Sequence, residues 1–156
     1  MPTTKEGAQR LLEFFIYGML AASESLGNPQ LFLRTVEEKG LRKFMLTDMP
    51  RFGASNNATE ACRAYTKEVD AEGLFDGSDT VFRGDDDEIQ VEIGDRCAYR
   101  RICTMRHDEG RPVYCIRAIA LEEMLRIRLD ANFDGKLQSF GRPCHIRMAR
   151  TEWRES

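Results

Sequence analysis

The chain has 156 residues, of which 42% are hydrophobic and 31% are charged, and its formal net charge is −3. This length suits one domain with a sizeable core, and the composition is that of an ordinary globular protein. A pI near 5.5 with interspersed charges argues against a nucleic-acid partner, which requires a basic stripe. We therefore expect a single domain over residues 1–156 that binds no nucleic acid.

Residues 5–26 are predicted to form a first helix that is deeply buried, because apolar side chains cover more than one of its faces. Its run LLEFFIYGMLAA resembles part of a signal peptide, but Glu13 interrupts the run and no small-residue cleavage site closes it. The run is also too short for a bilayer, which takes about 20 residues. Five cysteines without regular spacing favour a reducing compartment. We expect a cytoplasmic protein with no membrane partner, and a homodimer through this apolar helix.

The second helix has a clear start signal. Asn28 is expected to be its N-cap and Pro29 its first residue, since each suits that position. Gly40 is typical of a C-terminal stop, so we expect the helix to end there, with a short continuation over 41–45.

The rest of the N-terminal half also predicts helical structure. Residues 47–57 are rich in turn residues and indicate a loop. Residues 58–71 carry apolar side chains at helical spacing and predict a third helix. Residues 1–73 are therefore expected to be mainly helical.

The pattern changes in the second half, where residues 74–150 predict a strand-rich part. We expect one strand within 74–83 and an acidic turn at 84–87. Apolar and polar residues then alternate over 88–93, which is typical of a strand with one buried face.

The end of the chain combines a long helix with a hairpin. The stretch 97–103 is ambiguous between strand and helix, and a polar loop follows it. Apolar periodicity predicts a long helix over 112–128. Residues 136–140 and 144–148 predict the final hairpin. The fold class that follows is α+β, with N-terminal helices packed on a small antiparallel sheet and a long helix before the final hairpin.

The chain has only two histidines, and each lies near cysteines. His107 falls between Cys103 and Cys115, and His145 follows Cys144. A thiolate with an imidazole is the usual donor set of a zinc site or of a nucleophilic cysteine. No Cys-x-x-Cys occurs, and free cysteines are often small buried hydrophobes, so metal binding, catalysis and packing all remain open.

The five cysteines occupy different positions relative to the predicted helices and strands. Cys97 follows a strand, and Cys144 opens the last strand. Cys115 is expected in the first turn of the long helix, whose dipole lowers the pKa of a thiol there. We expect these three to converge on one pocket. Cys103 is a further candidate for the pocket, and Cys62 is expected to pack in the core.

Basic and aromatic side chains bracket the same region. Arg101 and Arg117 are predicted to contact the ligand together with Tyr99, because a guanidinium holds an acidic group by two parallel hydrogen bonds.

The helix CIRAIALEEML and the ending FGRPCHIRM resemble the 4-vinyl reductase-type domain. The resemblance implies binding of small, often hydrophobic molecules, and zinc in those members that hold it through cysteines and a glutamate. Cys115 and Cys144 would fall at two ligand positions. The family's Glu-x-x-Cys is missing from FDGKLQSF, so Cys97, Cys103 or His107 would have to complete the site.

A second resemblance is to proteins grouped with L-2-amino-thiazoline-4-carboxylic acid hydrolase. It rests on Cys97 with Tyr99, on Cys115, and on the Gly-x-x-Cys of residues 141–144. It implies a cysteine nucleophile that opens a small ring. Both resemblances cover about residues 88–148.

These observations give a first hypothesis and two alternatives. The first is a domain that binds or senses a small hydrophobic ligand in a cysteine-lined pocket, where Cys97, Cys115 and Cys144 either line the pocket or hold a metal, with zinc as the candidate. The second is a thiol-dependent hydrolase, with Cys97 or Cys115 as nucleophile and His107 as base. The third is redox sensing through a reversible disulfide between Cys97 and Cys103 or between Cys115 and Cys144.

Overall fold

The computed structural model describes residues 5–48, 55–71 and 79–152, and these form five helices and four strands. In chain order the elements are α1 (Lys5–Ser25), α2 (Pro29–Asp48), α3 (Ala58–Ala71), β1 (Thr80–Gly84), β2 (Glu88–Ile93), α4 (Arg100–Asp108), α5 (Ile116–Leu129), β3 (Asn132–Ser139) and β4 (Cys144–Thr151). The α+β fold class predicted from the sequence is confirmed, with helices before a final hairpin.

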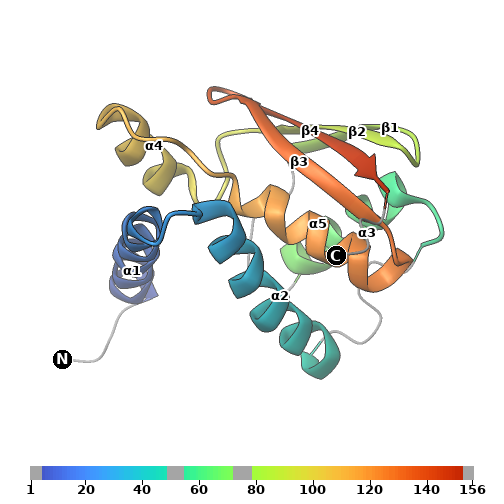
Figure 1. The fold of residues 1–156 in the computed structure, drawn as a ribbon, viewed down its shortest axis with the longest axis horizontal. Coiled ribbons are helices and arrows are strands. Elements are labelled where there is room, and N and C mark those ends of the chain that lie inside the picture. Colours follow the sequence, from blue (N-terminus) through green and yellow to red (C-terminus); the bar gives the residue numbers. More distant parts are fainter. Residues whose placement is uncertain (1–4, 49–54, 72–78, 153–156) are drawn as a thin grey trace.

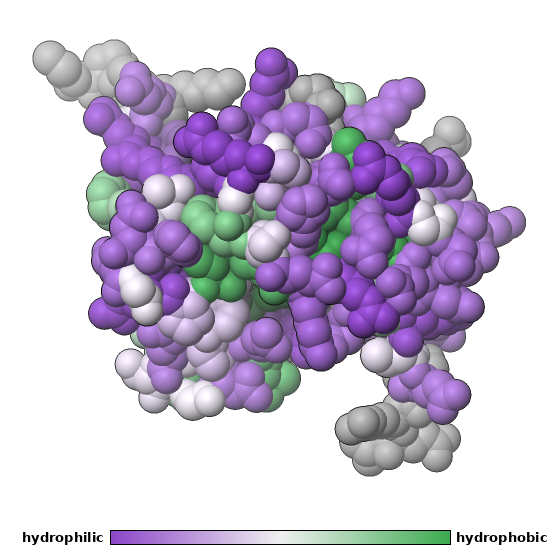
Figure 2. Space-filling view, turned by 90° about the horizontal axis from the view of Figure 1, so that it is seen from above, coloured by the Kyte–Doolittle hydropathy of each residue, from purple (hydrophilic) through white to green (hydrophobic). Residues whose placement is uncertain are grey.

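The four strands form one antiparallel sheet in the order β1-β2-β4-β3. Alternation along β2 turns Ile89, Val91 and Ile93 into the core, as the sequence predicted. The other face carries charged side chains, among them Glu88, which accepts a hydrogen bond from Arg147 at 2.7 Å. Seen from the sheet side, the surface is mostly hydrophilic, with apolar areas in recesses between charged residues (Figure 2).

The predicted acidic turn joins β1 to β2. Gly84 has a φ of +131°, and a Cβ there would lie 2.0 Å from the carbonyl oxygen of Glu88, so only glycine fits. The side chain of Asp85 closes the turn by accepting hydrogen bonds from the backbone N–H groups of Asp87 and Glu88, at 2.8 and 3.0 Å. The acidic turn therefore has a structural role, because its first carboxylate accepts backbone hydrogen bonds that close the hairpin.

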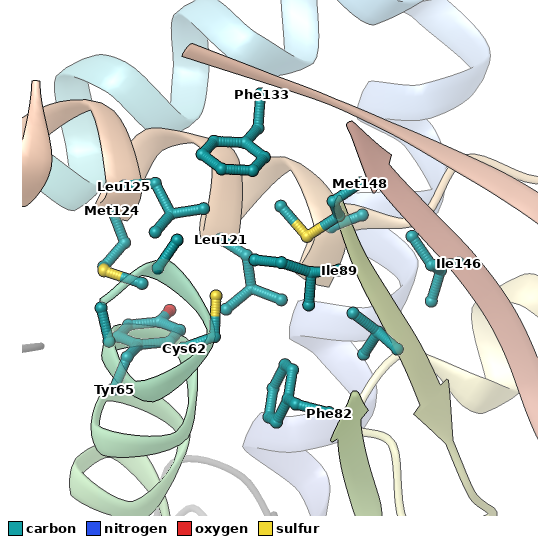
Figure 3. Packing of buried hydrophobic residues seen from close by; sticks show 14 of the residues in the cluster. Cys62, Tyr65, Phe82, Ile89, Leu121, Met124, Leu125, Phe133, Ile146 and Met148 are labelled. Carbon is teal, nitrogen blue, oxygen red and sulfur yellow. The ribbon is translucent and has the colours of Figure 1, made fainter. Parts of the chain in front are cut away.

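Helix α5 lies against the inner face of the sheet, and α2 and α3 pack on α5 (Figure 1). Met124 and Leu125 of α5 are fully buried: Leu125 lies beside Phe133 of the sheet, and Met124 lies beside Tyr65 of α3 (Figure 3). Cys62 of α3 lies in the same core, as expected.

Helices α1 and α4 form the other end of the molecule (Figure 1). A second apolar cluster joins them to α2 and α5 through Leu20, Leu33, Ile102, Ile116 and Ile119. The charged side chain of Arg106 is buried beside this cluster, where it is ion-paired with Glu24 and donates to the carbonyl of Pro112 at 2.9 Å.

The prediction of a deeply buried first helix is wrong. Among the side chains of α1 that the structure describes, only Leu20 and Ser23 are buried, while Leu11 and Phe15 are 73% and 64% exposed. The reason is that α1 packs on α2 and α4 along one side only, so its other apolar face meets solvent. Within the described ranges, no helix has the length and apolar character needed to cross a membrane.

Helix α2 starts as predicted and ends later than predicted. The side chain of Asn28 accepts a hydrogen bond from the backbone N–H of Leu31 at 3.1 Å, which confirms the N-cap. Gly40 does not stop the helix, which continues to Asp48. Phe44 and Met45 pack on the core beyond this glycine, and that burial outweighs the cost of about 1 kcal/mol for glycine in a helix.

Two further boundaries differ from the sequence expectation. The ambiguous stretch 97–103 enters a helix, α4, which begins at Arg100. The long helix was expected from residue 112 but α5 begins at Ile116, and Cys115 is its N-cap residue with extended backbone. Pro112 lies in the segment before it and gives its carbonyl to Arg106, so tertiary contacts set this start. The predicted residues 74–78 of the first strand lie outside the described residues.

Candidate ligand cavity and cysteine cluster

An apolar cavity of about 500 Å³ lies among the helices. All five helices or the segments just before them contribute to its wall, and most of the side chains are aliphatic or aromatic. The apolar part includes Leu12, Ile16, Leu41, Phe44, Val69 and Leu121. This volume falls in the range of small-molecule sites, which are mostly apolar with a few polar groups that orient the ligand.

Four polar groups of the apolar cavity come from four different segments. Tyr65 belongs to α3, Tyr99 is the residue just before α4, and Arg117 lies in the first turn of α5. Glu37 comes from α2 and is half-buried in the wall. The guanidinium of Arg117 donates a hydrogen bond to the hydroxyl of Thr80 at 3.0 Å, which ties it to the sheet.

Among the polar residues of the apolar cavity, Glu37 has a carboxyl whose pKa is strongly raised. Burial, together with the negative charge of Glu123, raises the pKa of the Glu37 carboxyl to about 7. Burial raises the pKa values of Tyr65 and Tyr99, and the negative charge of Glu37 acts in the same direction. The cavity therefore contains a carboxyl that titrates near neutral pH and two phenols that stay protonated there.

The cysteines converge in a second, smaller cavity. Its wall contains the three cysteines that were expected to converge, Cys97, Cys115 and Cys144, together with Cys103. They come from the segment after β2, from α4, from the start of α5 and from the start of β4. Cys144 is held in place by the guanidinium of Arg100, which donates to its Sγ at 3.3 Å.

This cysteine-lined cavity has a volume of only about 20 Å³. That is room for about one water molecule, since a site for a single water needs at least about 10–15 Å³. Within the described ranges, no three or more histidine, cysteine or acidic side chains are arranged as a metal site. Thiolates are the donors that zinc prefers, but the sulfur atoms as placed do not fit a bound zinc ion. Zinc held by Cys97, Cys115 and Cys144 stays a prediction.

The expected lowering of the pKa of Cys115 is wrong. Burial raises the pKa of its thiol to about 11, although a hydrogen bond from the backbone of Ala118 acts in the opposite direction. Cys115 is the N-cap residue and lies with three other thiols in the cysteine cavity, where desolvation outweighs the helix dipole. Burial also raises the pKa of Cys103, to about 12. Both thiols are therefore protonated at neutral pH.

Two predicted site residues lie outside both cavities. His107 is exposed and its ring packs on Phe140, with the ring centroids 5.0 Å apart, so Phe140 and not His107 lines the cysteine cavity. Arg101 is also exposed, where it bonds to Glu13 at 3.2 Å and stacks over Phe14. Catalysis by Cys97 or Cys115 with His107 as base stays a prediction, and in this structure the imidazole is not in the cavity wall.

Tyr99 and Arg117, by contrast, line both cavities and form the wall between them. Both are predicted ligand contacts from the sequence, whereas Glu37 and Tyr65 are not. Tyr65 falls within the predicted helix 58–71, and Glu37 lies in an ordinary charged stretch, TVEEKG, with no local signal.

No protein-family model, curated protein or solved structure matches this chain at a significant level.

Proposed function

We propose that this protein is a small-molecule-binding or sensory domain whose ligand occupies the apolar cavity among the helices. The observation that carries the proposal is the cavity itself, with a volume of about 500 Å³, an apolar wall and a few polar groups that come from different elements. The cysteine cavity, with room for about one water molecule, is too small for an organic ligand. In this proposal the cysteines adjoin the ligand through Tyr99 and Arg117 and do not contact it.

The order of elements supports the same proposal. Helices come first, then two strands, then α5 and a hairpin that carries Cys144, which is the layout implied by the resemblance to the 4-vinyl reductase-type domain. All five cysteines are free thiols, which agrees with the proposed cytoplasmic location.

Two matched glycines provide a test. Gly40 lies in the cavity wall and Gly18 on α1 does not, yet a Cβ at either one meets no atom within 4 Å. Both are inside helices, so Gly40→Phe and Gly18→Phe change helix propensity alike. Only Gly40→Phe places a ring at the cavity.

The measurement is titration of each variant with Nile red, followed by its fluorescence, with native mass spectrometry of the protein purified from cells. We expect saturable binding by wild type and by Gly18→Phe, and a loss of about tenfold in affinity in Gly40→Phe, equivalent to 1.4 kcal/mol. Equal binding by all three proteins, or no saturable binding by any, would contradict the proposal.

The alternative, a thiol-dependent hydrolase, is supported by the convergence of four thiols on one point. Its substrate would need a larger opening beside Cys97 and Cys115 than the present cavity offers. The reactivity of the thiols toward iodoacetamide separates the two functions.

A further inference from the structure

The apolar cavity has three charged side chains in its wall, Glu13, Glu37 and Arg117. Two of them are engaged by groups of the protein. Glu13 is ion-paired with Arg101 at 3.2 Å, and Arg117 donates a hydrogen bond to Thr80 at 3.0 Å. Glu13 is therefore neutralised by an ion pair, and Arg117 is oriented by a neutral hydroxyl group.

Glu37 differs from both. Across the described ranges, no hydrogen bond or ion pair reaches its carboxylate. Its neighbour in sequence, Glu38, instead faces a polar groove and lies 3.6 Å from Arg126. A half-buried carboxylate in an apolar wall is costly unless it is paired, so the cavity offers the place for a positive group.

The surroundings of Glu37 suit a cation with an apolar body. The phenol rings of Tyr65 and Tyr99 line the same cavity as Glu37, and aromatic faces attract ammonium groups. Phe44 and Leu41, on the same helix as Glu37, line the apolar part of the wall. An anionic group beside Glu37 would be repelled by its carboxylate, and a neutral group there would leave the carboxylate unpaired; the positive charge of Arg117 lies elsewhere in the same wall.

We propose that the ligand is an amphipathic amine, whose protonated nitrogen pairs with Glu37 and whose apolar body fills the rest of the cavity. This inference rests on the proposed function, since it names the ligand class of the same cavity. It makes Glu37 the residue that determines the specificity of the site.

The test compares ligands with the same apolar body and different head groups, decylamine, decanol and decanoate, by isothermal titration calorimetry. The proteins are wild type, Glu37→Gln and the matched control Glu38→Gln, whose carboxylate lies outside the cavity. We expect wild type and Glu38→Gln to bind decylamine at least about tenfold more tightly than decanol, equivalent to 1.4 kcal/mol, and Glu37→Gln to lose this preference.

The pH dependence of binding provides a second readout. An alkylamine stays protonated between pH 6 and 8, since its pKa is near the value of about 10.4 for lysine. Glu37 loses most of its negative charge when the pH is lowered from 8 to 6, because its pKa is about 7. The affinity of wild type for decylamine should therefore fall about tenfold from pH 8 to pH 6, and that of Glu37→Gln should not.

Other ionisable groups that face Glu37 do not produce the same profile. Burial keeps Tyr65 and Tyr99 protonated, Arg117 is hydrogen-bonded to Thr80, and Glu123 is ion-paired with Arg126. From α1, Glu13 is ion-paired with Arg101.

The outcomes separate this inference from the proposed function. If decanol or decanoate binds wild type as tightly as decylamine does, the cavity binds ligands but the amine assignment is wrong. The assignment is equally wrong if Glu37→Gln keeps the preference for the amine. If none of the three ligands binds wild type, and Nile red does not bind either, both proposals are overturned.

Discussion

The guanidinium of Arg100 donates a hydrogen bond to Sγ of Cys144 at 3.3 Å, joining the start of α4 to the final hairpin. The same side chain donates to the carbonyls of Gly141 at 2.6 Å and Gly94 at 2.8 Å. Arg100 therefore fixes the ends of β2 and β4 beside the cysteine cavity.

We expect Arg100→Ala to lower the free energy of unfolding by about 2–4 kcal/mol, because the half-buried carbonyls of Gly94 and Gly141 lose a charged donor. The matched control is Arg101→Ala, which removes an exposed ion pair with Glu13 and should cost less than about 1 kcal/mol. Urea denaturation of both variants checks the difference. Similar losses in the two variants would show that the network of Arg100 is not structural.

The ion pair between Arg106 and Glu24 is the second structural prediction. Arg106 is 1% exposed, so Glu24→Gln leaves a buried positive charge without its partner. Such a loss costs about 3–5 kcal/mol when both charges are buried, and we expect about 2 kcal/mol here because Glu24 is partly exposed. Thermal and urea unfolding measure it. The exposed pair of Glu60 and Arg63 is the control, since Glu60→Gln should change stability by less than about 0.5 kcal/mol.

Glu37 should make stability depend on pH even without a ligand. Its pKa is about 7 in the folded protein and 4.5 ordinarily, so between these values the unfolded chain releases a proton that the folded one retains. The free energy of unfolding should therefore fall as pH rises from 5 to 7.5, by about 2 kcal/mol. Glu37→Gln should lack this component, while Glu38→Gln should keep it. Parallel pH profiles of wild type and Glu37→Gln would show that the carboxyl titrates normally.

The three thiols whose pKa is raised should react slowly with alkylating reagents. At neutral pH a thiol with a pKa of about 11, as for Cys115, forms on the order of a hundredfold less thiolate than a model thiol of pKa about 8.5. We expect Cys62, Cys103 and Cys115 to resist iodoacetamide in the native protein at pH 7 and to react after unfolding in urea. Peptide mass spectrometry identifies the labelled positions. Fast native labelling of Cys115 would favour the hydrolase over the binding domain.

The exposed apolar face of α1 should mediate self-association. Leu11 and Phe15, together with Leu12 and Phe14, are more than half exposed along one helix, and apolar patches of this kind are typical of interaction surfaces. We expect a homodimer in sedimentation velocity, and a shift to monomer in Leu11→Ser/Phe15→Ser with little change in melting temperature. The control is Leu46→Ser on α2, which is exposed outside this face and should leave the dimer intact. A monomeric wild type would exclude the homodimer.

The sequence alone determined the features that depend on local chemistry. The alternation over 88–93 fixed a strand with one buried face, and Asn28 with Pro29 fixed the start of α2, because each signal acts within a few residues. The convergence of Cys97, Cys115 and Cys144 was also predicted, since each was placed at the end of an element.

Only the tertiary structure decided what surrounds these elements. The exposure of α1 depends on how many neighbours cover it, and the passage of α2 through Gly40 depends on the core that Phe44 and Met45 reach. The pKa of Cys115 follows its burial, which no local pattern encodes.

The difference is clearest for Glu37 and Glu38. The two are chemically identical neighbours in the sequence, yet one enters an apolar cavity and the other lies near Arg126 in a polar groove. Successive residues of a helix point in directions about 100° apart, and the packing of other helices around α2 gives each direction its surroundings. The sequence therefore predicted a helix here, and the long-range packing made one of its carboxylates a candidate binding group.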